Sequence, residues 1–230
     1  MQVLTIASRK GGSGKTTLAG HLAVAAEQAG NGPVAVIDTD PQGSLSDWWN
    51  MRAAPAPRFV TTSLASLQDD LATLRLKDTR LVIIDTPPAM DDAVSRIVAC
   101  SDLVLIPTRP SPHDLRSIGA TLNLVERLGK PLVFVINSAT VNARLTLETV
   151  KLVSRYGPLA PATIHHRVDF AASMTDGRTV MEIPSATRAV EEITKLWGYV
   201  SDRLESQIKG PSLPAPRRLG AASQPSISAS

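Results

Sequence analysis

A glycine-rich stretch near the start of the chain contains the residue types that bind phosphate. Residues 9–17 read RKGGSGKTT, directly after the apolar run 3–7 and before a helical pattern. Glycines let backbone N–H groups surround a phosphate, and the start of the following helix adds partial positive charge. In this arrangement Lys15 neutralises the β- and γ-phosphates, and the Thr16 hydroxyl ligates Mg²⁺. The predicted phosphate-binding residues are Gly11, Gly12, Ser13, Gly14, Lys15, Thr16 and Thr17.

Aspartates follow two other apolar runs. Asp85 ends the run LVIID, and Asp38 and Asp40 belong to the segment DTDPQGS. Asp38 and Asp40 are two positions apart, so they face the same way on an extended chain. We expect Asp85 to act on Mg²⁺ through water, while one carboxylate of the pair supports the magnesium shell and the other orients water. Either member of the pair, taken alone, is also typical of a turn cap.

Short apolar runs alternate with amphipathic helical patterns, and these elements must position the polar residues. The apolar runs, which are rich in β-branched residues, occupy 3–7, 34–38, 81–85, 103–107 and 132–137. Helical spacing occupies 16–29, 113–128, 144–156 and 185–207. Repeated strand–helix units predict an α/β fold with a doubly wound, mainly parallel sheet flanked by helices on both faces. Ligands in such sheets bind at the carboxyl ends of strands, which is where the glycine stretch and the aspartates lie.

The composition is that of a globular protein with one segment that differs. Of 230 residues, 43% are apolar, 20% charged and 3% aromatic, and the net charge is +3. Residues 209–230 are rich in Pro, Ser, Ala and Gly, so we expect a domain at 1–208 and a disordered tail at 209–230. Three cations and no acids lie in the tail, and without them basic and acidic residues are equal in number. Any nucleic-acid surface must therefore be a local patch.

The single cysteine and the lack of long apolar runs exclude some classes of protein. Cys100 alone cannot form an intrachain disulfide or a zinc cluster, and we expect it to be a buried thiol in a reducing cytoplasm. The start of the chain lacks the pattern of a signal peptide. No stretch reaches the roughly 18 apolar residues that a membrane span needs. The sequence therefore predicts a soluble protein.

Taken together, the motifs resemble those of a known family. KGGSGKTT, DTDPQ and IIDTPP are similar to the deviant Walker A ATPases of the ParA/MinD superfamily, which are P-loop NTPases. The greatest likeness is to small ParA-type plasmid partition ATPases that lack an N-terminal DNA-binding domain, and it covers residues 1–205. Arg9 stands where the standard phosphate loop has its first glycine, and Lys10 follows it.

The resemblance implies roles for individual residues. Lys10 is the signature lysine, which reaches across a dimer interface to the other subunit's nucleotide and adds a cation at the developing phosphate charge. Lys15 binds the phosphates, and Asp40 positions the attacking water. The implied metal site consists of Thr16, Asp38 and Asp85.

Two further positions are implied to lie near the adenine. Asn137 ends the run 132–137, where the family often has an asparagine that contacts adenine. Pro107 belongs to the segment IPTRPSPHDL, which resembles a stretch linked to adenine binding and dimer contacts. For Asn137, a strand-end cap or turn residue is the alternative. Arg109, in the same segment as Pro107, faces either a partner or solvent.

The function implied by the resemblance is that of a Mg²⁺-dependent ATPase that is weak without a partner. ATP drives a sandwich homodimer, which binds DNA non-specifically or polymerises. A centromere- or cargo-binding partner protein then stimulates hydrolysis and releases the dimer, which segregates a plasmid, a chromosome or another cargo. The expected location is the nucleoid in the cytoplasm, with no membrane association. Arg167 and Arg188 are the candidate DNA contacts, although each alone is typical of an ordinary surface arginine.

Two alternatives carry different sequence requirements. A MinD-like membrane-associated positioning ATPase needs a C-terminal amphipathic helix with a basic and apolar face. The Pro/Ser-rich tail holds few large apolar residues, which disfavours this alternative. A relative of nitrogenase iron protein needs paired cysteines for its cluster, and Cys100 alone does not fill that pattern.

Overall fold

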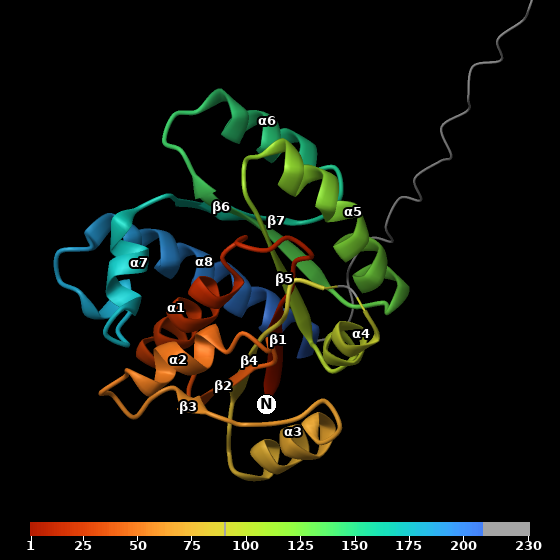
Figure 1. The fold of residues 1–230 in the computed structure, drawn as a ribbon, viewed down its shortest axis with the longest axis vertical. Helices are drawn as coiled ribbons and strands as arrows, with labels where there is room; N and C mark the ends of the chain where they lie inside the picture. The colour runs from red at the N-terminus through yellow and green to blue at the C-terminus, as the bar shows by residue number, and fades with distance from the viewer. Residues whose placement is uncertain (90, 209–230) are drawn as a thin grey trace, which may run out of the picture.

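Seven parallel strands form the central sheet of the computed structural model, which describes residues 1–89 and 91–208 (Figure 1). Their order across the sheet is β3-β2-β4-β1-β5-β6-β7. The strands are β1 Gln2–Ile6, β2 Val34–Asp38, β3 Arg58–Phe59, β4 Leu81–Asp85, β5 Leu103–Thr108, β6 Leu132–Ala139 and β7 Leu159–His165. This confirms the predicted α/β class and its parallel sheet. The tail predicted at 209–230 lies outside the described residues.

Helices cover both faces of the sheet because side chains alternate along each strand. Leu4 and Ile6 pack into one hydrophobic cluster, with residues of α1, α2, α7 and α8, while Val3 packs into a cluster with residues of α3 and α4. A third cluster joins α4, α5 and α6 to the strands β5 and β6. The helices are α1 Lys15–Gln28, α2 Ser44–Asn50, α3 Leu67–Leu76, α4 Asp92–Ala99, α5 Pro112–Arg127, α6 Arg144–Val153, α7 Val168–Met174 and α8 Thr187–Ile208, with a short 3₁₀ helix at Val180–Glu182.

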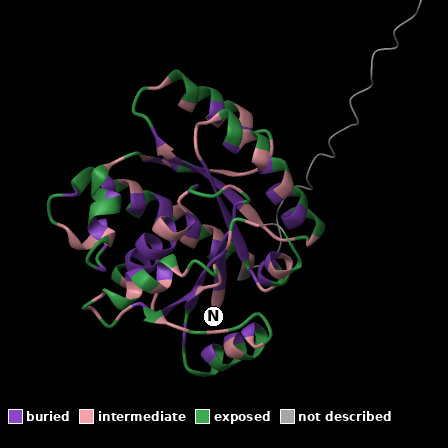
Figure 2. Cartoon of the chain, in the orientation of Figure 1, coloured by how far each residue is buried: buried purple, intermediate pink, exposed green. Residues whose placement is uncertain are grey.

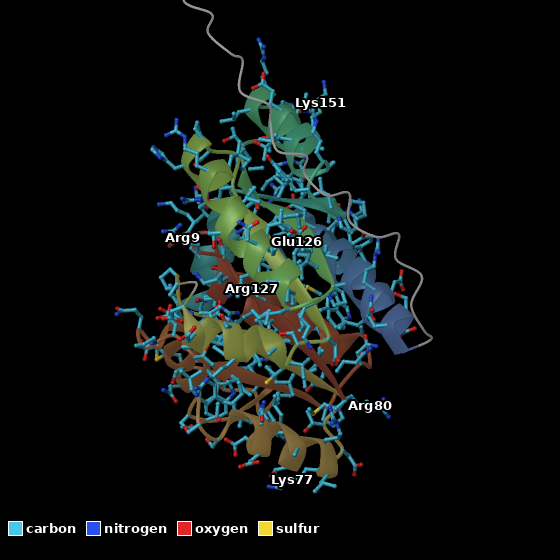
Figure 3. All side chains as sticks on the ribbon, turned by 90° about the vertical axis from the view of Figure 1, so that its right-hand side faces the viewer. Arg9, Lys77, Arg80, Glu126, Arg127 and Lys151 are labelled. Carbon is cyan, nitrogen blue, oxygen red and sulfur yellow. The ribbon has the colours of Figure 1, made fainter. Side chains whose placement is uncertain are left out.

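Burial follows this layered arrangement. The strands and α1 are largely buried, whereas the outer sides of the other helices are exposed (Figure 2). Charged side chains such as Lys77, Arg127 and Lys151 point away from the sheet (Figure 3). None of the helices among residues 1–89 and 91–208 is long and apolar enough to span a membrane.

The sheet has its switch point at β1, which lies between β4 and β5. The chain leaves β1 through α1 toward β2 on one side, and the later strands β5, β6 and β7 extend the sheet on the other. A crevice forms beyond the carboxyl ends of strands at such a point. The residues that follow β1, β2, β4 and β5 therefore meet around the glycine-rich loop.

The five predicted strands and four predicted helices all form, with ends shifted by a few residues. The sequence did not predict β3, β7 or the short helices α2, α3, α4 and α7. β7 reads LAPATIH, and its proline and exposed positions weaken the apolar pattern because it is an edge strand. Cys100 is half-buried rather than buried, since it lies just past the end of α4 beside the core cluster of α3.

Candidate nucleotide-binding site

The glycine-rich loop connects β1 to α1 in the way the sequence predicted. Gly12 and Gly14 adopt φ angles of 70° and 92°, which L side chains rarely take. A Cβ atom on Gly14 would lie 2.1 Å from Nδ2 of Asn137, so only glycine fits there. Asn137 is buried, and its Nδ2 donates a hydrogen bond of 2.7 Å to the carbonyl of Ser13. The end of β6 thus anchors the back of the loop.

Lys15, Thr16 and Asp85 form the charged centre of the site. Oγ1 of Thr16 donates a 2.5 Å hydrogen bond to Oδ2 of Asp85, which is fully buried at the end of β4. Burial raises the pKa of Asp85 to about 7. Burial also lowers the pKa of Lys15, while the negative charges of Asp85 and Asp40 act in the opposite direction.

These residues fit a bound magnesium ion. Oδ1 of Asp85 is buried without a hydrogen-bond partner, beside the hydroxyl group that the sequence assigns to the metal. Mg²⁺ at nucleotide sites is held by one or two protein oxygens together with phosphates, and Thr16 and Asp85 supply such a donor set. Residues 1–89 and 91–208 contain no cluster of three or more His, Cys, Asp or Glu side chains arranged for a metal.

Asp38 and Asp40 hold the segment between β2 and α2. The carboxylate of Asp38 accepts hydrogen bonds from the backbone N–H groups of Asp40, Leu45 and Ser46 at 3.0, 2.9 and 3.0 Å. Asp38 therefore caps the start of α2. Asp40 accepts a 3.0 Å hydrogen bond from the N–H of Gln42 and lies half-buried at the pocket wall. The two aspartates have different surroundings although they are two residues apart.

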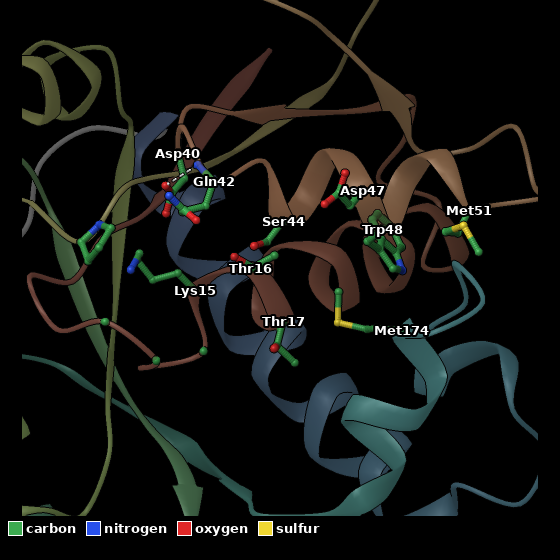
Figure 4. Close-up of a pocket in the computed structure, with 14 residues that line it drawn as sticks. Lys15, Thr16, Thr17, Asp40, Gln42, Ser44, Asp47, Trp48, Met51 and Met174 are labelled. Atoms are coloured by element: carbon green, nitrogen blue, oxygen red, sulfur yellow. Dashed lines mark hydrogen bonds between the residues drawn. The ribbon is translucent and has the colours of Figure 1, made fainter.

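A pocket of about 640 Å³ runs from the phosphate loop along α2. Figure 4 shows Lys15, Thr16 and Asp40 toward one end and Met51 and Met174 toward the other. Its lining comprises Gly11, Gly12, Gly14, Lys15, Thr16, Thr17, Asp40, Gln42, Ser44, Asp47, Trp48, Met51, Pro88 and Met174. The pocket is therefore polar at the phosphate loop and partly apolar beyond it.

Several predicted residues do not line this pocket. Lys10 lies half-buried at the front of the loop, with its N–H directed to Oγ of Ser8 at 3.3 Å. Pro107 is buried inside β5, opposite Val135 of β6. Ser13, Asp38, Asp85 and Asn137 stand behind the lining residues, in contact with the loop, the magnesium site or α2.

Arg167 and Arg188 lie together, away from the phosphate loop, in a second groove of about 360 Å³ between β7 and α8. Glu192 accepts hydrogen bonds from Arg167 Nη2 at 2.6 Å and interacts with His165 Nδ1 at 2.8 Å. Hydrogen bonding to Glu192 raises the pKa of Arg167. Lys195 also lines the groove. The two candidate arginines are thus neighbours, and one of them is held by a carboxylate.

The sequence did not identify the residues that form the far end of the pocket. Trp48 and Met51 come from α2 and the residue after it, and Met174 ends α7. The indole N–H of Trp48 donates to the carbonyl of Arg178 at 2.9 Å, which ties α2 to the segment after α7. Their neighbourhood depends on a contact across 130 residues of sequence.

Comparison with known proteins gives the same assignment over most of the chain. Residues 4–180 match the family model "CobQ/CobB/MinD/ParA nucleotide binding domain". The chain is 27% identical to maintenance of carboxysome distribution protein A of Halothiobacillus neapolitanus, over 86% of this chain and 95% of that protein.

Two solved structures share the fold. The McdA(D38A)–ATP complex of Cyanothece has a TM-score of 0.67 at 18% identity, covering 94% of this chain and 99% of that one. The MinC:MinD complex of Aquifex aeolicus has a TM-score of 0.71 at 15% identity, with the same coverage. The phosphate loop, the parallel sheet and the family match agree, and the chain belongs to the CobQ/CobB/MinD/ParA nucleotide-binding family, within the ParA/MinD superfamily of ATPases.

Proposed function

We propose that this chain is an ATP-hydrolysing positioning ATPase that segregates a plasmid, a chromosome or another cargo. The observation that carries the proposal is the joint placement of Lys15, Thr16, Asp40 and Asp85 at one phosphate loop, with Lys10 outside the pocket of its own chain. The names of similar proteins, which refer to carboxysome distribution, plasmid partition and chromosome partitioning, support a positioning role.

The proposed reaction is transfer of the γ-phosphoryl group of ATP to water. Backbone N–H groups of residues 11–17 and the ammonium of Lys15 bind the β- and γ-phosphates. Asp40, at the pocket wall, orients the attacking water and accepts its proton. The products are ADP and inorganic phosphate.

Thr16 and Asp85 would hold Mg²⁺, which when bound neutralises charge on the phosphate oxygens. We place Asp38 behind them, acting through water, because its carboxylate already accepts backbone hydrogen bonds from the start of α2. Asp38 then links the metal site to α2. A change in the occupancy of the site would reach α2 through this aspartate.

Lys10 is proposed to act on the nucleotide of a second copy. It follows the exposed Arg9 and precedes the exposed Gly11 and Gly12, so it stands on a face that another molecule can approach. Lys10 does not line the pocket of its own chain. Its proposed role in hydrolysis is therefore to contact the nucleotide held by a facing subunit. ATP would therefore drive a face-to-face homodimer, and hydrolysis would end it.

The dimer is proposed to bind DNA non-specifically through the groove between β7 and α8, and so to associate with the nucleoid in the cytoplasm. Arg188 and Lys195 line this groove, together with Arg167. Non-specific binding needs only phosphate contacts, so a small basic patch is enough. A centromere- or cargo-binding partner protein would stimulate the weak ATPase and release the dimer from DNA.

The adenine of the nucleotide is proposed to lie near Asn137 and Pro107.

A MinD-like membrane-associated ATPase is the second candidate, because the fold matches a MinD complex as well as McdA. The segment 209–230, which would have to form the membrane-binding helix, lies outside the described residues. Flotation with liposomes that contain anionic lipids separates the two candidates. ATP-dependent flotation supports the membrane candidate, and ATP-dependent binding to DNA with no flotation supports the first.

Light scattering with ADP, ATP or a non-hydrolysable ATP analogue, each with Mg²⁺, tests the proposal. We expect a monomer with ADP and a dimer with the analogue. Asp40→Ala should form a lasting dimer with ATP itself, because it binds ATP without turnover. A monomer under every condition would contradict the proposal, and so would undiminished hydrolysis by Asp40→Ala.

A further inference from the structure

Arg109 lies beside the phosphate loop although it belongs to the segment after β5. β5 pairs with β1 in parallel, so the chain that leaves β5 passes the loop that follows β1. A Cβ atom built on Gly12 would lie 3.8 Å from Nη1 of Arg109. The side chain of Arg109 is 35% exposed. Its guanidinium therefore stands at the outer side of the loop, beside the exposed Gly12.

A buried carboxylate fixes the direction of this guanidinium. Nε and Nη2 of Arg109 donate to Asp114 at 3.3 and 3.4 Å, and the Asp114 side chain is only 2% exposed. Oγ of Ser111 donates to the same carboxylate at 2.7 Å and accepts from the N–H of Asp114 at 3.2 Å. Asp114 is thereby held in the first turn of α5, where the helix dipole favours a negative charge.

One edge of the guanidinium remains available for another group. Arg109 Nη1 has no hydrogen-bond partner among the part of the chain that the structure describes, whereas Nε and Nη2 are both directed to Asp114. Arginine presents planar N–H donors that match phosphate oxygens. The free edge faces the loop, and it has the chemistry to bind a phosphate.

The phosphate of the same chain is the less suitable candidate for this free edge. Arg109, like Lys10, does not line the pocket that contains Lys15, Thr16 and Asp40. Arg9 and Lys10 precede Gly11 and Gly12 in the same loop, so the front of the loop is rich in cations, and two such faces repel each other. An anion brought by a facing molecule removes this repulsion.

We propose that Arg109 binds the triphosphate held by a second copy of this chain, next to Lys10, and that Asp114 positions it for this contact. The inference rests on the proposed function, because the contact exists only when two ATP-bound copies face each other. It adds a second cation from the facing subunit to each active site. It also gives the segment PTRPSPHD a role in recognising ATP across the interface.

Arg109→Gln tests the contact. We expect a fall in turnover on the order of 100-fold, as when one preorganised donor to developing charge is removed, with unchanged ATP affinity of the monomer. Arg116→Gln is the matched control, because Arg116 lies exposed on α5, the helix that holds Asp114, and makes no ion pair within the part of the chain that the structure describes. Asp114→Asn should lower kcat with unchanged ATP affinity. If Arg109→Gln or Asp114→Asn loses ATP affinity by the same factor as it loses turnover, the proposal is overturned.

Mixing two defective variants decides which subunit uses Arg109. In a mixed dimer of Arg109→Gln and Asp40→Ala, one site has Asp40 from its own chain and Arg109 from the facing chain. We expect an equal mixture to recover roughly a quarter of wild-type turnover, because half of the dimers are mixed and one of their two sites is complete. No recovery would place Arg109 at its own nucleotide and overturn the inference.

If wild-type protein stays monomeric with ATP, the proposed function itself fails. If the wild type dimerises and Arg109→Gln is fully active, only this inference fails.

Discussion

Asp85 and Lys15 have opposite charges when ionised, and both are buried without enough polar partners to stabilise these charges fully. Burial disfavours both charged forms, so the pKa of Asp85 rises to about 7 and the pKa of Lys15 falls. A magnesium ion beside the carboxylate and phosphates beside the ammonium would each restore the charged form. The residues at the loop are thus arranged for a ligand that carries both charges, which is what a magnesium nucleotide does.

Lys15→Ala is expected to abolish ATP binding. The change removes the one lysine that lines the pocket while leaving the glycine backbone in place. We expect a loss of affinity on the order of 100-fold or more, as for one partner of a buried, hydrogen-bonded charge pair. Titration calorimetry with a non-hydrolysable analogue measures it. Lys10→Ala is the control, because Lys10 lies outside the pocket, and this variant should bind ATP as a monomer. Equal ATP affinity of Lys15→Ala and the wild type would refute the role of Lys15.

His21 predicts a dependence of stability on pH. It is fully buried on α1, and its Nδ1 donates to the carbonyl of Thr17 at 2.7 Å. Burial lowers its pKa from 6.5 to about 4, so folding favours the neutral ring. This stability is fully present above pH 6.5 and is lost as the pH falls toward 4, because the unfolded chain is protonated first. Between pH 7 and 5 the loss amounts to about 2 kcal/mol.

Urea unfolding of the wild type and His21→Asn at pH 7, 6 and 5 checks this expectation. Asparagine keeps a donor near the position of Nδ1 and does not titrate, so comparing the two proteins separates His21 from the carboxylates. The variant should lose less stability on acidification than the wild type. Parallel curves for the two proteins would show that His21 is not the group responsible.

At the scale of elements, α2 connects the nucleotide site to the segment that follows α7, which contains Gly177 and Glu182. Asp38 caps its start, and Arg52, just beyond its end, makes a two-pronged ion pair with Glu182 at 2.9 and 2.8 Å. Arg52 also stacks over Trp48 at 5.4 Å. Gly177 approaches the backbone of Arg52 so closely that a Cβ atom would lie 2.4 Å from it. Both ends of α2 are therefore held by charge and close packing.

The sequence predicted the long strands and helices to within a few residues of their ends but did not predict this connection. Apolar periodicity marks elements with a continuous buried face, such as α1 and β4. α2 has seven residues, and its far end is held by the pairing of Arg52 with Glu182, 130 residues further along the chain. A polar pair between residues so far apart in the sequence produces no apolar periodicity from which it could be predicted. For the same reason the phosphate loop was predicted residue by residue, because its motif is local, whereas the far end of the pocket was missed.

Arg52→Ala is expected to destabilise the fold more than an exposed ion pair does. The Arg52 side chain is 4% exposed, and its removal leaves Glu182 partly buried without its cation. We expect the free energy of unfolding to fall by about 3 kcal/mol. Arg144→Ala is the control, since the Arg144–Glu148 pair is exposed and its loss changes stability by less than about 1 kcal/mol. Equal urea midpoints for the two variants would contradict a structural role of the Arg52 pair.

At the scale of the whole molecule, the two candidate surfaces lie in different parts of the fold. The phosphate loop opens at the carboxyl end of β1 near the middle of the sheet, whereas the second groove lies at the β7 edge, against α8. From the sequence, Arg167 and Arg188 were the candidate DNA contacts implied by the family resemblance. No sequence pattern indicated that Glu192 would hold one of them, because 25 residues separate Arg167 from Glu192. The two proposed binding sites therefore do not overlap, and any coupling between nucleotide and DNA would have to pass through the fold or the proposed dimer.

The salt dependence of DNA binding tests how many phosphate contacts the two arginines make together. Each phosphate contact contributes about 0.9 to the slope of log affinity against log salt concentration. Because Glu192 neutralises Arg167 at 2.6 Å, we expect Arg167→Ala/Arg188→Ala to reduce this slope by about 1 rather than about 2. Fluorescence anisotropy with ATP and unrelated duplexes measures it from low to moderate salt. Arg75→Ala on α3, which packs against β2 and β4 rather than β7, is the control. A slope unchanged by the double substitution would move the DNA surface away from α8, whereas a reduction of about 2 would mean that DNA displaces Glu192 from Arg167.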